Sequence, residues 1–231
     1  MKTELVEVHG IKMKLRFWRD WDFVKEEFFE DMYVLDDVSQ NSIVIDLGAH
    51  IGTFTLRCAK LRGCEVYAYE PGSESFSLLV ENVGLNGLTD RVKCFNEAVG
   101  KRYAPRKFYV EETQGSSSFY LGINPDFKDK PLKLERVQCT TLKRIFEDNG
   151  IEECDTLKMD IEGAEREVLN DESKPYFKRV RYVAIEWHNY DGHIYRDYMQ
   201  QLGFKVLLTG TGIPVPAYSP TFNRGMLYAK R

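Results

Sequence analysis

The stretch from Ile43 to Phe54, IVIDLGAHIGTF, constrains the fold more than any other part of this 231-residue chain. An apolar run ends in Asp46, passes through Gly48 and Gly52, and continues with helical spacing. This order predicts a strand, a tight turn and a helix, in which Gly48 lets the backbone approach a ligand closely. Gly52 would let the helix pack near the strand, and the start of that helix would offer unpaired N–H groups. The stretch therefore predicts a nucleotide-cofactor loop.

The acid at the tip of this first strand indicates which cofactor the loop would hold. Asp46 would repel a pyrophosphate, but it would attract a ligand that carries an ammonium and a sulfonium, such as S-adenosylmethionine. Glycine pairs after strands also occur as plain tight turns, so the loop alone leaves both interpretations open. The cofactor contacts predicted from this loop are Asp46, Gly48, His50, Gly52, Thr53 and Phe54.

Strand and helix patterns alternate from residue 43 onward, which predicts an α/β fold with a Rossmann-like, mostly parallel sheet. The last two strands follow each other without a helix between them, so they should be antiparallel, with one strand reversed near the sheet edge. The predicted strands are 43–46, 64–69, 91–96, 154–159, 180–186, 204–208 and 225–230. The predicted helices are 53–62, 73–86 with Ser73 as its N-cap, a short helix capped by Thr140 or Thr141 that ends at Asn149-Gly150, and 193–202.

Polar residues follow the second and third predicted strands. Glu70, before Pro71, is placed where a carboxylate of a doubly wound fold accepts hydrogen bonds from ribose hydroxyls. Asn96, Glu97 and Ala98 offer a small, polar edge for an adenine ring. Taken alone, Glu70 could be an exposed glutamate at an ordinary turn. The tips of three predicted strands, however, all carry residues that suit the same cofactor.

The sequence LKMDIEGAE forms a second dense cluster after the strand 154–159. Asp160 falls at the strand tip and Glu162 on the turn, so both are candidates for the reaction centre. Glu165 is the ordinary acidic complement of a helix N-terminus. Lys158 is a weaker candidate base, because strand alternation puts it on the same face as Asp160, where an ion pair would keep it protonated.

His188 ends the fifth strand of the predicted parallel sheet, in the sequence EWHN. A hydroxyl acceptor must lose its proton to a base with a pKa near neutral, and His188 is the candidate. A competing hypothesis is that Asp160, Glu186 and His188 bind a divalent metal ion that orients substrate oxygens. A structural role for His188 is the third alternative, and metal binding is not the prediction favoured here.

Two segments stand outside the alternating pattern. Residues 1–40 predict an extension that acts as a lid or a lateral support, with a hairpin over 4–17 and a helix over 22–37 capped by Asp22. Residues 101–139, which include Gly115 and three serines, predict an inserted hairpin and loop over the sheet edge. The cofactor domain would then span 41–231.

The composition is that of an ordinary globular protein, with 43% hydrophobic residues and a formal charge of −4. This balance does not favour a nucleic-acid partner, and the basic pairs Lys101-Arg102 and Arg106-Lys107 are interpreted as solvated loops. Five cysteines without a C-x-x-C pair indicate reduced core residues. Without a signal segment or a long apolar run, we expect a cytoplasmic protein not bound to membranes. The sequence does not indicate an oligomeric state.

The motifs IDLGAHIGTF, VYAYEP, ENVGLNG, NEAVG, LKMDIEGAE and IEWH, together with the serine-rich loop, resemble the FkbM-type family of class I S-adenosylmethionine-dependent methyltransferases. This resemblance implies a seven-stranded sheet with an antiparallel last strand, and methyl transfer typically to a hydroxyl oxygen. By position, it places Asp46, Gly48 and Gly52 at the methionine side and Glu70 at the ribose. It places Asn96 and Glu97 at the adenine and Asp160 beside the sulfonium.

This resemblance implies a hydroxyl on a small molecule or sugar as the acceptor. Methylation of a nitrogen or a nucleic acid is the first alternative, although the Asn/Asp-Pro-Pro-aromatic turn of amino methyltransferases is replaced here by Asp160-Ile161-Glu162-Gly163. A non-catalytic cofactor-binding module is the second. A nicotinamide-dependent oxidoreductase is the third, but its loop would usually carry a glycine at the position of His50.

Overall fold

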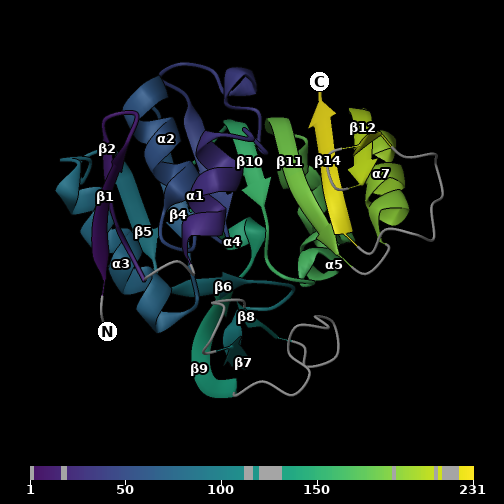
Figure 1. The fold of residues 1–231 in the computed structure, drawn as a ribbon. Coiled ribbons are helices and arrows are strands. Elements are labelled where there is room, and N and C mark those ends of the chain that lie inside the picture. Colours follow the sequence, from purple (N-terminus) through teal and green to yellow (C-terminus); the bar gives the residue numbers. More distant parts are fainter. Residues whose placement is uncertain are drawn as a thin grey trace.

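The computed structural model describes residues 3–16, 20–111, 117–119, 132–188, 191–210, 213–214 and 224–231. Its centre is an eight-stranded sheet in the order β13-β12-β14-β11-β10-β3-β4-β5 (Figure 1). The strands are β3 (Ile43–Leu47), β4 (Glu65–Tyr69), β5 (Val92–Phe95), β10 (Cys154–Met159), β11 (Val180–His188), β12 (Lys205–Gly210), β13 (Ile213–Pro214) and β14 (Arg224–Lys230).

The strand directions confirm the predicted α/β fold. β5, β4, β3, β10 and β11 are mutually parallel, whereas β14 pairs antiparallel with both β11 and β12. The reversed strand therefore lies between β11 and β12, and the two-residue β13 adds a short eighth strand beside β12. A parallel sheet brings the carboxyl ends of its strands to one edge, so the polar tips predicted from the sequence meet there.

Helices cover both faces of this sheet, because its parallel strands are apolar on both sides. α1 (Trp21–Phe28), α2 (Thr53–Arg62) and α3 (Ser73–Leu85) cover one face, and α4 (Leu142–Asp148), α6 (Lys174–Phe177) and α7 (Gly192–Gln201) cover the other. Each face of the sheet has its own hydrophobic core. Successive residues of β3 point to opposite faces, so Val44 packs in the core under α1, α2 and α3, and Ile45 packs in the core under α4, α6 and α7. Short helical turns, α5 (Glu165–Val168), η2 (Leu35–Asp37) and η4 (Asp171–Ser173), complete the framework.

The predicted N-terminal hairpin is present as β1 (Glu4–Val8) and β2 (Ile11–Leu15). It packs against α3 rather than beside the sheet, with Ile11 and Met13 buried. The Asn82 side chain of α3 accepts from the backbone N–H of Lys14 at 2.6 Å and donates to its carbonyl at 3.2 Å. The hairpin is therefore an outer layer over the helices of the first face.

The helix predicted over 22–37 was wrong beyond residue 28. α1 ends at Phe28, and the chain turns through Asp31 and Val34, whose φ values of 48° and 53° are left-handed. The Asp31 carboxylate accepts from the N–H of Leu35 at 3.0 Å and from the Arg57 guanidinium of α2 at 2.8 Å. These tertiary contacts hold a turn where the sequence pattern alone favours a helix.

The predicted helix caps had mixed outcomes. α1 is preceded by Asp20 instead of starting from an Asp22 cap, and α3 is preceded by Gly72, with Ser73 as its first residue. The Ser73 hydroxyl donates instead to Glu135 of the insertion at 2.9 Å. The predicted cap of α4 is confirmed, because the Thr141 side chain accepts from the N–H of Arg144.

The insertion forms a second, four-stranded sheet in the order β6-β9-β7-β8. Its strands are β6 (Glu97–Val99), β7 (Ala104–Glu111), β8 (Ser117–Ser118) and β9 (Leu132–Thr140), so the predicted hairpin is present. The strand predicted over 91–96 ends at Phe95, and β6 turns away to join this second sheet. Gly115 and Ser116 of the serine-rich loop lie outside the described residues.

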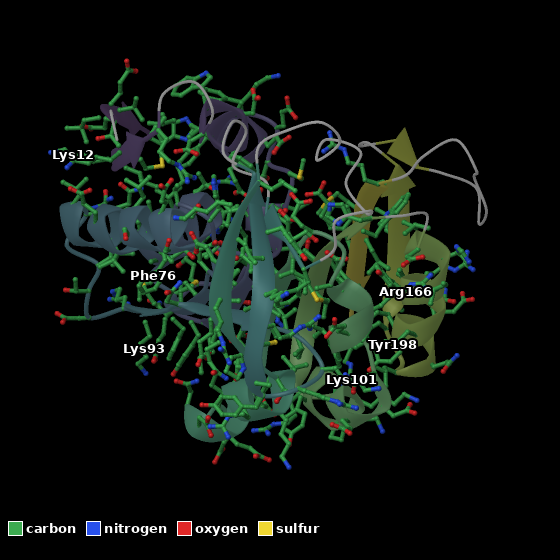
Figure 2. The ribbon with its side chains drawn as sticks, turned by 90° about the horizontal axis from the view of Figure 1, so that it is seen from below. Lys12, Phe76, Lys93, Lys101, Arg166 and Tyr198 are labelled. Atoms are coloured by element: carbon green, nitrogen blue, oxygen red, sulfur yellow. The ribbon has the colours of Figure 1, made fainter. Side chains whose placement is uncertain are left out.

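The small sheet lies across the carboxyl edge of the main sheet (Figure 1). Figure 2 views the molecule from below and shows its strands crossing the middle, between α3 with Phe76 on one side and α7 with Tyr198 on the other. Loops at this edge of an open α/β sheet are where ligands bind. The insertion is thus placed to wall a ligand site.

The cysteines match the interpretation of reduced core residues. All five are free thiols, and all except the half-buried Cys94 are buried. Within the described residues, no helix has the length and apolar character needed to cross a membrane.

Candidate active site

The glycine turn after β3 is fixed by the neighbouring strand. Gly48 has φ +82°, and a Cβ added there would lie 1.8 Å from the backbone oxygen of Asp160. No side chain fits between the two strand tips, so this position requires glycine. Gly52 has φ +96° and faces Leu79 of α3, so it permits helix–helix packing instead of the predicted helix–strand approach.

Asp46 lies beneath this turn and is fully buried. Its carboxylate accepts from the Thr55 hydroxyl at 2.6 Å and lies 3.3 Å from Nζ of Lys158. Lys158 also donates to the carbonyl oxygen of Gly48 at 2.7 Å. Asp46 therefore lies behind the loop rather than on a ligand-facing wall, and its predicted direct contact with the cofactor stays a prediction.

The expected ion pair of Lys158 with Asp160 is present at 4.0 Å, and Asp46, which was not predicted as a partner, lies closer, at 3.3 Å. Burial alone lowers the pKa of Lys158, but the charges of Asp46 and Asp160 outweigh it, and the pKa is raised. An ammonium that stays protonated cannot accept a proton, which agrees with its rank as the weaker candidate base.

A cleft of about 620 Å³, counted to its open mouth, lies between the main sheet edge and the small sheet. Most of the predicted cofactor residues meet in its wall, which is formed by Phe23, Gly48, His50, Tyr69, Glu70, Pro71, Glu97, Ala98, Val99, Phe108, Phe119, Asp160, Ile161 and Glu162. Three strand tips that are distant in sequence thus share one cleft.

Glu70 is buried at the centre of this wall. Its two carboxylate oxygens accept from the backbone N–H groups of His50 at 2.9 Å and Gly72 at 2.7 Å. Burial raises the pKa of Glu70 to about 7, although these hydrogen bonds oppose the shift. The two bonds hold the carboxylate in one orientation, and each oxygen keeps a lone pair for a ribose hydroxyl.

His50 adopts a left-handed φ of 52° and connects the glycine loop to the N-terminal extension. Its Nε2 lies 2.6 Å from the Arg16 guanidinium, and its ring packs 4.2 Å from that of Phe23. Burial, followed by the charge of Arg16, lowers the pKa of His50 to about 3. The imidazole is therefore neutral and accepts a hydrogen bond from Arg16.

Some of the remaining predicted residues line the cleft, and others only support the residues that line it. Glu97 and Ala98 line the cleft, as expected for the adenine end. Asn96 does not line it: its amide donates to the carbonyls of Glu70 at 2.9 Å and Pro71 at 3.0 Å, and so braces that strand tip. Thr53 and Phe54 line a smaller cavity that shares Gly48 and Asp160 with the cleft.

His188 lies among carboxylates at the other end of the cleft. Its Nδ1 is 3.2 Å from Glu165 and its Nε2 is 3.6 Å from Glu162. Burial lowers the pKa of His188, but Glu165, Glu162 and Glu186 outweigh it and raise the pKa well above 6.5. An imidazolium at neutral pH does not act as a base, so this environment counts against the predicted base role.

Glu165 does more than complement a helix N-terminus. It is fully buried, and one oxygen accepts from the backbone N–H groups of Ile161 and Gly163, both at 3.2 Å. The same oxygen contacts His188. Glu165 therefore fixes both the turn after β10 and the imidazole.

Several residues of this site were not predicted from the sequence. Arg16 and Asp20 form a buried ion pair of 2.9 Å behind His50, and Phe23 and Tyr69 line the cleft. Tyr33, for which the aromatic cluster of the extension favours a core position over a pocket wall, is buried and donates to Asp160 at 3.1 Å. Except for Tyr69, these residues belong to the N-terminal extension. Only knowledge of how the extension packs against the residues that follow β3 and β10 could have identified them.

Comparisons with known proteins agree with this geometry. The family model of the Methyltransferase FkbM domain matches residues 46–206. The chain is 28% identical over 201 residues to the 31-O-demethyl-FK506 methyltransferase FkbM of Streptomyces tacrolimicus, covering 74% of this chain and 75% of that one. It is 40% identical over 67 residues to a tRNA (guanine(37)-N(1))-methyltransferase of Anopheles darlingi, covering 29% of this chain and 13% of that one.

A solved structure has the same fold. TrmK of M. capricolum in complex with S-adenosylhomocysteine superposes with a TM-score of 0.50 at 11% identity, over 87% of this chain and 67% of that one. The family match spans the glycine loop, the Glu70 tip, the insertion and the acidic cluster around Asp160. The chain therefore belongs to the FkbM family of methyltransferases, which use S-adenosylmethionine as cofactor.

Proposed function

We propose that this methyltransferase transfers the methyl group of S-adenosylmethionine to a hydroxyl oxygen of a small molecule or sugar. The supporting observation is the arrangement of two cavities around Asp160. Asp160 and Glu162 line the cofactor cleft, and a second cavity of about 1030 Å³, also counted to its open mouth, is lined by Glu26, Glu30, Glu186 and Arg224. A smaller cavity contains both Asp160 and Glu26 and so lies between the two.

In this proposal the adenosine lies along Glu70, Pro71, Glu97 and Ala98, and the methionine end points to Gly48 and Asp160. The buried Glu70 carboxylate would accept from the ribose hydroxyls. The acceptor would approach from the second cavity, because displacement at carbon requires the nucleophile on the side of the methyl opposite to sulfur. The N-terminal extension would then be a wall of the acceptor site, since Glu26 and Glu30 belong to it.

The chemistry is a single displacement. The acceptor oxygen forms a bond to the methyl carbon, the carbon–sulfur bond breaks, and its electron pair stays on sulfur to give S-adenosylhomocysteine. The hydroxyl proton must leave to a base. We assign this role to Glu162, which lines the cleft and lies on a left-handed turn with φ 52°, in preference to His188.

The relative of Streptomyces tacrolimicus, whose name specifies a 31-O position, supports transfer to oxygen. The similarity to a tRNA methyltransferase favours the alternative, a nitrogen of a nucleic acid, but it covers only 67 residues. The acidic second cavity and the formal charge of −4 oppose binding of a polyanion. These observations together favour a small hydroxylated acceptor.

The test begins with calorimetric titration of the protein with S-adenosylhomocysteine, with NADH as the control ligand. The protein is then incubated with S-adenosylmethionine and either a panel of hydroxylated small molecules or total tRNA, and mass spectrometry locates the added methyl. Methylation of a hydroxyl supports the proposal, whereas methylated tRNA alone would replace it with the alternative. The Glu162→Gln variant should lose turnover while it keeps its affinity for S-adenosylhomocysteine.

A further inference from the structure

Three potential metal ligands converge between the cofactor cleft and the second cavity. Asp160, Glu186 and His188 each bring one ligand atom within 4.8 Å of the other two. They come from adjacent parallel strands, because Asp160 directly follows β10 and the register pairs Met159 with Ile185. Oxygen and nitrogen ligands at about 2.1 Å from one ion lie roughly 3 Å apart when adjacent and about 4.2 Å when opposite. Small side-chain adjustments would therefore close this set around an ion.

The orientation of His188 suits a ligand. Its Nδ1 lies 3.2 Å from the fully buried carboxylate of Glu165, which is the usual second partner of a metal-bound histidine. A cation would displace the Nε2 proton of the imidazolium, and with the Nδ1 proton still donated to Glu165 the freed Nε2 lone pair would face the side of Glu162, which lies at 3.6 Å. This arrangement selects the tautomer that binds a cation.

The local charge also favours a cation. Four carboxylates surround the imidazole, those of Asp160, Glu162, Glu165 and Glu186, and Arg224 is the cation that lines the second cavity beside Glu186. Lys158 also lies 4.0 Å from Asp160, so with His188 protonated four carboxylates face three cationic groups. Close like charges at a partly buried site are unfavourable, and a divalent cation would neutralise the excess.

The second cavity gives such an ion room for further ligands. Glu186 lines this cavity of about 1030 Å³, so the three-residue set borders space large enough for water or a substrate. A site with three protein ligands and open positions is the arrangement of a catalytic ion, whereas structural sites are usually closed by protein.

We propose that Asp160, Glu186 and His188 bind a divalent cation, Mn²⁺ or Mg²⁺, whose remaining coordination positions face the second cavity. Two carboxylates and one imidazole form a donor set that suits Mn²⁺. If the proposed function holds, an acceptor with two neighbouring oxygens would bind this cation, which would lower the pKa of the reacting hydroxyl. The acceptor class narrows accordingly to vicinal diols, hydroxy acids and similar chelating molecules.

The test is a titration of the full chain with MnCl2, in the absence of any cofactor, with free Mn²⁺ measured by electron paramagnetic resonance. The variants are Glu186→Gln and His188→Gln, which remove one ligand each. Glu30→Gln is the matched control, because Glu30 lines the same cavity but pairs with Lys25 at 3.2 Å, away from the three ligands. Circular dichroism checks that each variant is folded.

We expect one Mn²⁺ per chain, affinity weaker by about tenfold or more in both ligand variants, and no comparable change in the control. Absence of saturable binding, or equal affinity in all four proteins, would overturn the proposal, and His188 would then be the cation of the cluster. The result is independent of the proposed function. If the chain binds Mn²⁺ but not S-adenosylhomocysteine, the metal site is supported and the proposed function is contradicted. If it binds S-adenosylhomocysteine but not Mn²⁺, the proposed function stands and the metal site is contradicted.

Discussion

The ammonium of Lys158 donates a 2.7 Å hydrogen bond to the carbonyl of Gly48, so a side chain of β10 holds the turn that follows β3. The same ammonium lies 3.3 Å from Asp46, and both side chains are almost entirely buried. A buried ion pair therefore supports the glycine turn after β3 from the side of the sheet. This relationship explains how a loop with two glycines keeps one conformation.

Replacing Lys158 with methionine should destabilise the protein, because it leaves Asp46 as a buried charge without its cation. Removal of one partner of a buried pair typically costs about 3–5 kcal/mol of unfolding free energy. Urea denaturation measures this loss. The double variant Lys158→Met with Asp46→Asn should recover part of it, and a single variant as stable as the wild type would show that the pair is dispensable.

Gly48→Ala should abolish binding of S-adenosylhomocysteine or unfold the chain, because the new Cβ would lie 1.8 Å from the Asp160 oxygen. Gly203→Ala is the matched control. Gly203 has a similar φ of +88° but open space around it, so this variant carries only the left-handed strain, about 1–2 kcal/mol. Thermal denaturation and calorimetry of the two variants separate the clash from the strain. Equal losses in both would contradict the close approach of β10.

Affinity for S-adenosylhomocysteine should increase as the pH rises through about 7, the pKa to which burial raises Glu70. The ionised carboxylate accepts ribose hydroxyls better than the protonated acid. Calorimetry from pH 6 to pH 8 tests this expectation. The Glu70→Gln variant should bind more weakly and lose that part of the pH dependence, and an unchanged profile in the variant would remove Glu70 from the ribose site.

The raised pKa of Glu70 should make the folded protein less stable as the pH rises, although the same rise in pH makes cofactor binding stronger. The folded pKa of Glu70 is raised from 4.5 to about 7, so between these values the unfolded chain has released a proton that the folded chain keeps. The contribution of Glu70 is fully present below pH 4.5 and is lost as the pH rises through 7. In urea titrations, Glu70→Gln should reduce the fall in unfolding free energy across this range relative to the wild type.

His50 should stay neutral throughout the pH range in which ordinary histidines titrate. Burial and Arg16 lower its pKa to about 3, so its ring resonances should not shift between pH 8 and pH 5. Nuclear magnetic resonance can follow them, with the His50→Asn variant identifying the signals. A midpoint near 6.5 would show that the Arg16 contact is absent in solution. Because the unfolded chain binds the proton first, the contribution of His50 to stability is lost as the pH falls from 6.5 toward 3.

The sequence determined the order of the elements and the chemistry at the strand tips. From Ile43 onward, apolar runs and helical spacing are local properties of the chain, and they predicted β3, α2, β4, α3 and β10 within one or two residues. The antiparallel direction of β14 was predicted because the sequence shows no helix between the last two strands. A parallel sheet brings its strand tips to one edge, which predicted that Gly48, Glu70, Glu97 and Asp160 lie together, and all four line one cleft.

Only the tertiary structure decided how these side chains are used. Asp31 stops α1 because Arg57 of another helix holds it, and Asp46 lies behind the loop because Lys158 and Thr55 are its partners. The three-residue set of Asp160, Glu186 and His188 likewise depends on the register of β10 with β11. Such contacts join residues far apart in the chain. Periodicity and turn signals contain no information on which side chains of two packed elements meet. The fold could therefore be predicted from the sequence, but the side-chain contacts of the site could not.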